Sequence, residues 1–309
     1  MQRPFNPKVV YHADWGSKAA KRWCAKAVLG EDDRYTAFAP EQVGNPGSLI
    51  GRLRTEAGED GCAFAGFDFP IGLPALYAER ASISSFRALL PELGCGEWKD
   101  FYSVCDYPEQ ISVHRPFYPN GAYTGRRKEE LFRGHGVSSV EPLLRCCDRG
   151  GKGVKRACCL FWTLGGNQIG KAAISGWRDV LAPALHDVRL WPFDGRLCSL
   201  LVPGNVVVAE TYPAECYGWF GEPPRSKGDQ DERKKFGGSF LRWADAQRVV
   251  LADRLRRDIQ RGFPQGDDAF DAVVGLFGML HVCLGQRESG EPTGCIIRRV
   301  EGWILGRKP

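Results

Sequence analysis

The chain has 309 residues, of which 43% are hydrophobic and 26% charged, and its net charge at pH 7 is +5. This composition is typical of a folded globular protein and excludes a disordered or fibrous chain. Apolar runs are all shorter than the roughly 20 residues that span a membrane, and the first residues lack the apolar stretch of a signal peptide. We therefore expect a cytoplasmic protein, with no membrane association, that forms one domain over residues 1–309.

The sequence contains 12 cysteines, a number that raises the question of disulfides or a zinc site. There is no Cys-x-x-Cys pair, and the closest group consists of two adjacent pairs, Cys146-Cys147 and Cys158-Cys159. Adjacent cysteines do not readily provide tetrahedral ligand geometry from one short loop. We expect reduced thiols that act as small buried hydrophobic groups, as is usual in the cytosol.

The N-terminal quarter predicts three strands followed by a helix. Residues 8–14 form an apolar run that ends in an acid, residues 22–29 alternate in polarity, and residues 35–38 follow a turn-like segment. A helix is expected over residues 45–57, because it starts with Asn-Pro and its apolar residues share one face.

The rest of the chain adds two strands and several helices. Residues 62–68 and 206–210 are almost continuously apolar, which is typical of parallel strands covered on both faces. Helices are expected over residues 231–259 and 267–284. The stretch between the last two strands is helical and loop-rich and contains no linker. We therefore predict an α/β fold with a mixed sheet flanked by helices, and a large, mostly helical insertion at about 75–200.

Five acidic residues occupy positions that would bring them together. Asp14, Asp68 and Glu210 each end an apolar strand, and Asp268 and Asp271 begin the last helix at i, i+3 spacing, on one face. Ligand sites in open α/β sheets lie beyond the carboxyl ends of strands. Clustered carboxylates repel one another unless a cation neutralises them. Oxygen ligands without histidine or cysteine favour Mg²⁺ or Mn²⁺, and two such ions can hydrolyse a phosphodiester.

Most of these acids also have a purely structural explanation. Asp68 could form a turn, Asp14 could start an Asx-turn, and Asp268 lies where a helix favours an acid. Glu210 is the hardest to explain in this way, because glutamate is neither a helix cap nor a turn former and follows four apolar residues.

The motifs HADWGS (12–17), FDFPIGLP (67–74), AETYPAE (209–215) and DDAFDAVVG (267–275) occur in this order. Together with GGNQIGKAAISGW (165–177) and EGWILG (301–306), they cover nearly the whole chain. They resemble the predicted RNase H-like nucleases of the uncharacterised family called domain of unknown function 429. The resemblance implies an RNase H-like core, with the insertion between the fourth and fifth core strands.

The resemblance also implies roles for individual residues. By analogy with Holliday-junction resolvases of this fold, Asp14 corresponds to the acid of the first strand and Asp68 to that of the fourth. Asp268 and Asp271 correspond to the acidic pair of the last helix. The acid of the fourth strand is usually Glu, and Asp68 departs from this pattern. The function expected from the site and the resemblance is a divalent-metal-dependent nuclease or phosphodiesterase that acts on nucleic acid by two-metal hydrolysis.

A nucleic-acid substrate would need cations beside these acids. Residues 115–128 form a predicted loop rich in basic and aromatic residues. We expect Arg115, Arg126 and Arg127 to bind phosphates. Lys171 is the fourth candidate. It lies in residues 165–172, which nearly match the pattern G-x-x-x-x-G-K-[ST] but end in Ala, without the hydroxyl that binds Mg²⁺.

Two other functions remain open from the sequence. Residues 14–17 (DWGS) match the D-x-G-[ST] phosphate loop of actin-like ATPases and sugar kinases, although the chain has only one set of strands. ATP binding would favour that alternative. A non-catalytic nucleic-acid-binding protein with a degenerate metal site is the second alternative, with Tyr118 or Tyr123 stacking on bases.

Overall fold

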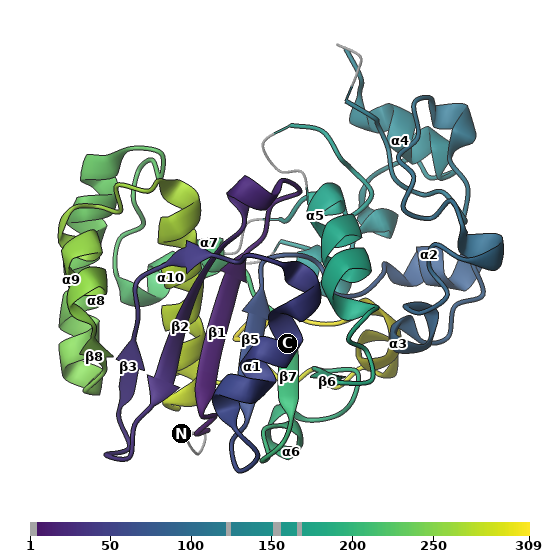
Figure 1. Ribbon diagram of the computed structural model, residues 1–309. Coiled ribbons are helices and arrows are strands. Elements are labelled where there is room, and N and C mark those ends of the chain that lie inside the picture. The colour runs from purple at the N-terminus through teal and green to yellow at the C-terminus, as the bar shows by residue number, and fades with distance from the viewer. Residues whose placement is uncertain (1–4, 122–124, 151–155, 166–168) are drawn as a thin grey trace.

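The computed structural model describes residues 5–121, 125–150, 156–165 and 169–309. Eight strands form one mixed sheet in the order β6-β7-β5-β1-β2-β3-β8, and β4 pairs with β2 (Figure 1). The bounds of the strands are β1 Val9–Asp14, β2 Trp23–Leu29, β3 Tyr35–Ala37, β4 Glu41–Gln42, β5 Ala63–Phe67, β6 Val188–Leu190, β7 Val206–Glu210 and β8 Val250–Leu251. The α/β prediction with a mixed sheet is confirmed.

The pairing directions divide the sheet into two halves. β1 pairs with β2 antiparallel, and β2 pairs with β3 in the same way. On the other side, β1, β5, β7 and β6 run parallel to one another. The carboxyl ends of β1, β5 and β7 therefore lie at one edge, at the top of the sheet in Figure 1.

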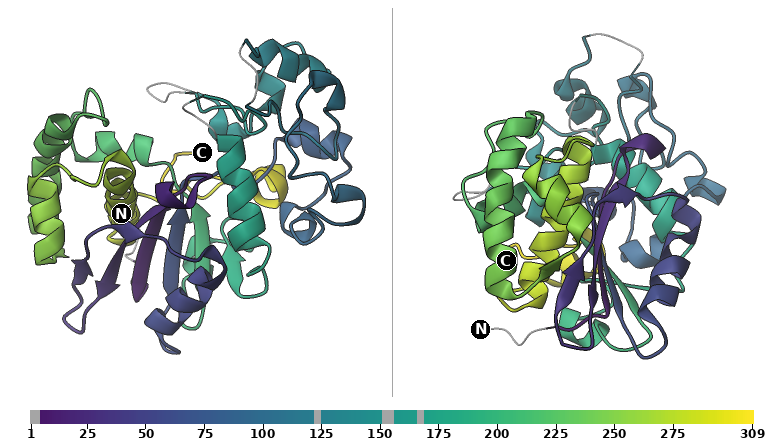
Figure 2. Two further views of the ribbon diagram at one scale, coloured as in Figure 1. Left: turned by 45° about the horizontal axis from the view of Figure 1, so that its top comes forward. Right: turned by 60° about the vertical axis from the view of Figure 1, so that its left-hand side comes forward.

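Helices cover both faces of the sheet, as the right-hand view of Figure 2 shows. Their bounds are α1 Leu49–Ala57, α2 Ala75–Arg80, α3 Phe86–Leu89, α4 Lys128–Gly134, α5 Ile169–Gly176, α6 Leu197–Leu200, α7 Pro213–Phe220, α8 Gln230–Gln247, α9 Asp253–Gln260 and α10 Asp267–Cys283. Helices α7 to α10 pack on one face. Helix α1 and much of the segment between β5 and β7 pack on the other.

Alternation along the central strands determines which side chain enters which layer. In β1, Val9 and Tyr11 belong to the core with α1, whereas Val10 belongs to the core with α10. Both sets are buried. The near-continuous apolar runs of the sequence have this cause, because neither face of these strands meets solvent.

The structure differs from the predicted elements in three places, one of which is the short strand β4, which was not predicted. The expected helix at 231–259 is two helices, α8 and α9, separated by the short strand β8. The segment between β5 and β7 is helical and loop-rich as expected, but it also contributes β6, which extends the sheet beyond β7. The segment therefore contains a strand that the sequence analysis does not predict.

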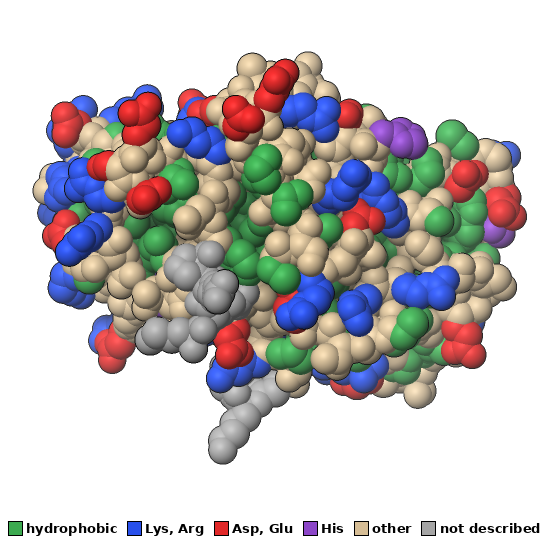
Figure 3. Space-filling view, turned by 90° about the horizontal axis from the view of Figure 1, so that it is seen from below, with side chains coloured by type: hydrophobic (Ala, Val, Ile, Leu, Met, Phe, Trp, Pro, Cys, Tyr) green, Lys and Arg blue, Asp and Glu red, His purple; other side chains and the backbone are tan. Residues whose placement is uncertain are grey.

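All 12 cysteines are free thiols, of which seven are buried, two are half-buried and three are exposed. In the described part of the chain, no helix is both long enough and apolar enough to cross a membrane. At the end of the molecule opposite the strand carboxyl ends, Lys and Arg side chains are interspersed with Asp and Glu (Figure 3). The net positive charge does not form a single basic surface at this end.

Candidate metal centre

Asp14 and Asp68 lie side by side at the carboxyl ends of β1 and β5. Asp14 is the last residue of β1, and Asp68 directly follows β5. Ala13 pairs with Phe67, so the two acids are at the next level of the ladder, where the Asp68 N–H donates to the Ala13 carbonyl at 3.0 Å. Alternation places both carboxyl groups on the face that α10 covers.

Helix α10 brings two further carboxylates to this position. Its packing on β1 is close, because the His12 ring lies 3.0 Å from the Ala272 carbonyl oxygen through its Nδ1 atom. Asp271 is buried and accepts hydrogen bonds from the Tyr217 hydroxyl and the Lys227 ammonium group. Asp268, one turn earlier, accepts from Lys21 at 2.7 Å.

The four aspartates line one cleft of about 570 Å³. The left-hand view of Figure 2 brings this end of the molecule forward, where the N-terminal ends of α5 and α10 approach the loop after β1. Three lysines and two tyrosines also line the cleft. The charged and aromatic lining residues are Asp14, Asp68, Asp268, Asp271, Lys18, Lys21, Lys227, Trp15, Tyr212 and Tyr217.

The pKa values of three aspartates of the cleft, Asp14, Asp68 and Asp271, are raised. Burial raises the pKa of Asp14 well above its usual range, and the nearby charges of Asp68 and Asp271 raise it further. Burial, followed by the charge of Asp271, raises the pKa of Asp68 to about 7. Burial also raises the pKa of Asp271, although Lys227 opposes this effect. A cation bound among these carboxylates would oppose this effect and favour their charged form.

The expectation that Glu210 belongs to the same site is not met. Glu210 pairs with Phe67, so its side chain shares the face of Phe67, in the core on the α1 side. Asp14 and Asp68 are one position further along their strands and point to the opposite face. Thr211, which directly follows β7, is on the same face of the sheet as Asp14 and Asp68. Its hydroxyl oxygen lies 2.9 Å from the Nε2 atom of His12.

Glu210 instead forms a buried ion pair with Arg145. Its two carboxylate oxygens each accept from the guanidinium group at 2.6 Å, and one also accepts from the Ile71 N–H at 2.7 Å. Asp148 accepts from the same guanidinium group at 2.8 and 2.9 Å. A fully buried arginine between two carboxylates is a structural arrangement, because each charge is paired and hydrogen-bonded.

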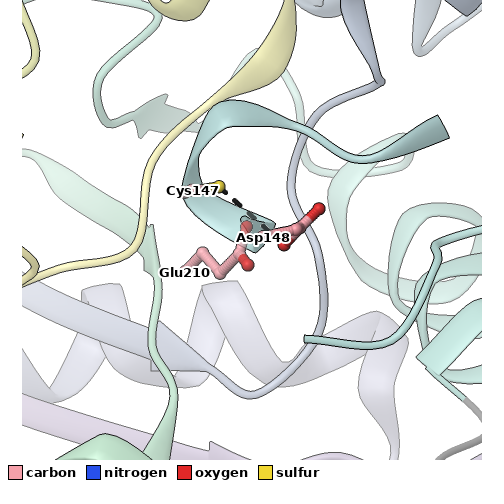
Figure 4. Close-up of side chains that lie close together, drawn as sticks. All are labelled: Cys147, Asp148 and Glu210. Atoms are coloured by element: carbon pink, nitrogen blue, oxygen red, sulfur yellow. Dashed lines mark hydrogen bonds between the residues drawn. The ribbon is translucent and has the colours of Figure 1, made fainter. Parts of the chain in front are cut away.

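Cys147, Asp148 and Glu210 are close enough to offer three ligand atoms to a metal ion (Figure 4). The Arg145 guanidinium group, however, already binds both carboxylates. Burial also raises the pKa of the Cys147 thiol well above its usual range, so the thiol stays protonated rather than becoming a metal-binding thiolate. We therefore do not assign a metal to this cluster, whose cation is Arg145.

The four basic residues expected at the site do not line the cleft, within the described residues. Arg115 donates to the backbone carbonyls of Ser103 and Val104. Arg126 packs over an aromatic ring, Arg127 precedes α4, and Lys171 lies on α5 without reaching the cleft lining. The guanidinium groups of Arg115 and Arg126 therefore contact their own segment of the chain.

The structure describes only part of the tyrosines expected to stack on bases and of the near-match to the phosphate-binding pattern. Tyr118 is fully buried and its hydroxyl donates to Glu130, so its ring is not open to a nucleic-acid base. Tyr123 and residues 166–168 of the near-match to the phosphate-binding pattern lie outside the described residues.

The cations of the cleft are residues that the sequence interpretation missed. Lys18 and Lys21 follow Asp14 by four and seven positions, so their proximity to the acid could have been used as a signal. Lys227 reaches Asp271 from a loop 44 positions earlier, and no local pattern indicates this contact.

A comparison of the chain with models of protein families, with curated proteins and with solved structures found no match. The assignment of the site therefore rests on its residues and their geometry.

Proposed function

We propose that the chain is a divalent-metal-dependent nuclease or phosphodiesterase with an RNase H-like core. The order β3-β2-β1-β5-β7, with antiparallel pairing only on the β2 side of β1, supports this fold. The segment between β5 and β7, including β6, would then be the insertion. The observation that carries the proposal is that Asp14, Asp68 and Asp271 meet in one cleft from three separate elements.

The residues of the cleft fit a hard divalent cation. The donors are carboxylate oxygens. Among the described residues that line the cleft there is no histidine, and the only cysteine is the half-buried Cys158. Such oxygen donors favour Mg²⁺ or Mn²⁺. A bound ion would supply an activated water and neutralise the leaving oxygen of a phosphodiester.

The chain's own residues would then bind and orient the substrate. Lys18 and Lys21 lie in the loop after β1, at the cleft, where ammonium groups can contact the phosphates of a polyanion. Asp14 and Asp68 would hold the cation at the strand ends. Asp271, hydrogen-bonded to the Tyr217 hydroxyl and paired with Lys227, would border the same site from the helix side.

The decisive experiment compares the wild type with Asp14→Asn and with Asp60→Asn, an exposed acid outside the cleft. Each protein is assayed with Mn²⁺ or Mg²⁺ on single-stranded, duplex, hybrid and branched nucleic acids and on a small phosphodiester. We expect slow cleavage by the wild type and Asp60→Asn that EDTA abolishes, and a loss of at least about 100-fold in Asp14→Asn. Equal residual activity in all three proteins would reveal a contaminating nuclease and remove the proposal. ATP binding without cleavage would instead favour a kinase-like function.

A further inference from the structure

Lys227 covers the carboxylate of α10 from the solvent side. Its ammonium group forms an ion pair with Asp271, whose side chain is only 5% exposed, whereas the Lys227 side chain is 50% exposed. The lysine lies in the loop between α7 and α8, and the same loop region borders the cleft. Lys227 therefore lies beside Asp271 at the cleft, with its own side chain half exposed to solvent.

Both oxygens of Asp271 are already engaged by this arrangement. Oδ2 accepts from Lys227, and Oδ1 accepts from the Tyr217 hydroxyl. Asp14 and Asp68 are different, because neither has a basic partner within 4.0 Å in the described part of the chain. The carboxylates of the strand ends are thus available to a cation, whereas that of the helix is not.

A buried arginine holds the Lys227 backbone in place. Arg233, on α8, is 4% exposed, and it donates to the Lys227 carbonyl at 2.6 Å. The same guanidinium group donates to the carbonyls of Gly262 and Phe263, at 2.9 and 3.2 Å, in the turn that leads into α10. Arg233 therefore ties the loop of Lys227 to the helix that carries Asp271.

The charges of the cleft also limit the number of ions. Four aspartates face three lysines, of which Lys21 and Lys227 form ion pairs with Asp268 and Asp271 respectively. One divalent ion beside Asp14 and Asp68 would offset the two carboxylates that have no ion-pair partner. Because Lys18 also lines the cleft, a second divalent ion would add to an excess of positive charge in a partly buried site, which costs solvation free energy.

We propose that the cleft binds a single divalent ion between Asp14 and Asp68, and that the Lys227 ammonium group occupies the place of a second ion at Asp271. Arg233 is the positioning residue for this lysine. The inference rests on the proposed function for the presence of the first ion. It goes further in assigning one protein cation and one metal ion to the site. Lys227 keeps two N–H groups for a phosphate oxygen of the substrate.

The test is the number of Mn²⁺ ions bound per chain, measured by isothermal titration calorimetry and by electron paramagnetic resonance of free Mn²⁺ at pH 8. We expect one ion for the wild type and two for Lys227→Met, because the substitution frees an Asp271 oxygen. Lys227→Arg, which keeps the charge, should bind one ion. Lys234→Met is the matched control, because this exposed lysine is on α8 outside the cleft, and it should also bind one.

The outcomes separate this inference from the proposed function. Two ions in the wild type and the same two in Lys227→Met would overturn the role of Lys227 and leave the metal site standing. No Mn²⁺ bound by the wild type at millimolar concentration would overturn both. If Lys227→Met does not fold, Lys227→Gln serves in its place, with the same expected gain of one ion.

Discussion

Gly275 of α10 lies directly against the imidazole ring of His12 on β1, and a Cβ atom at this glycine would overlap the ring. Gly275 lies about one helical turn after Asp271 on α10, and His12 lies two residues before Asp14 on β1. The contact therefore sets the separation between the helix and the strand directly beneath the cleft.

Substitution of this glycine should disturb both the fold and the site. We expect Gly275→Ala to lower the free energy of unfolding by about 1–3 kcal/mol, because the added methyl group forces α10 away from β1. Its affinity for Mn²⁺ should fall as well. The matched control is Gly51→Ala on α1, where nothing lies within 4 Å of an added Cβ. That variant should gain up to about 1 kcal/mol from helix propensity. Urea unfolding and Mn²⁺ titration measure the two effects, and an unchanged Gly275→Ala protein would contradict the prediction.

Asp68 should make the metal-free protein less stable at alkaline pH. Burial, followed by the charge of Asp271, raises its pKa in the folded protein from 3.8 to about 7. The folded state therefore binds more protons than the unfolded state between these values. The resulting stabilisation is full below pH 3.8 and is lost as the pH rises through 7. With EDTA, the wild type should lose on the order of 1–3 kcal/mol between pH 5 and pH 8 relative to Asp68→Asn.

Mn²⁺ should reverse this difference. Added at 100 times its Kd and at pH 8, the ion should stabilise the wild type by about 2.7 kcal/mol and Asp68→Asn by much less. The measurement is chemical unfolding at the two pH values with EDTA or Mn²⁺. A pH dependence that is identical in the two proteins would show that Asp68 titrates normally.

Glu210 should prove to be a structural residue. Arg145→Met leaves Glu210 and Asp148 buried without a counter-ion, and we expect a loss of about 3–5 kcal/mol in unfolding free energy. Glu210→Gln keeps the Arg145–Asp148 pair and should cost less. In the folded protein, Glu210→Gln should bind Mn²⁺ with the affinity of the wild type. A folded Glu210→Gln protein that no longer binds Mn²⁺ would return Glu210 to the metal centre.

Lys18 should contribute to nucleic-acid binding, whereas Arg115 should not. Lys18 lines the cleft, but the Arg115 guanidinium group binds backbone carbonyls of its own segment. We expect Lys18→Ala to weaken binding and to reduce the slope of log K against log salt by about 0.7–0.9, the value of one phosphate contact. Fluorescence anisotropy in EDTA, which prevents cleavage, measures both variants. A larger loss of binding affinity in Arg115→Ala than in Lys18→Ala would instead favour phosphate binding by the 115–128 loop, as the sequence predicted.

The sequence was informative about the edge of the sheet where the acids lie, because an apolar run that ends in a carboxylate marks the end of a buried strand. It was not informative about the face of the sheet to which each acidic side chain points. Val206 to Glu210 are buried throughout, so the run has no polar alternation that would reveal which way Glu210 points. Only the register with β5, a pairing between distant segments, determines that direction.

The end of α8 and the position of Lys227 could not be predicted from the sequence, because both depend on features that no local pattern reveals. The helix expected to continue through residue 248 ends there, because Arg248 adopts a left-handed backbone with a φ of 57°. Glycine or asparagine usually signals such an end, and arginine does not. The contact of Lys227 with Asp271 depends on how α7, α8 and α10 pack, which no short pattern encodes.

The Arg145–Glu210 ion pair makes the central sheet and the segment between β5 and β7 dependent on each other for stability. Arg145 comes from the long segment between β5 and β7, and Glu210 ends a central strand of the sheet. A shortened protein that joined β5 to β7 through a brief loop would leave Glu210 in an apolar layer with no cation. The segment is therefore not a detachable module. Any minimal version of this sheet must replace Glu210 at the same time, for example with an apolar residue that matches its neighbours Val206 and Val208.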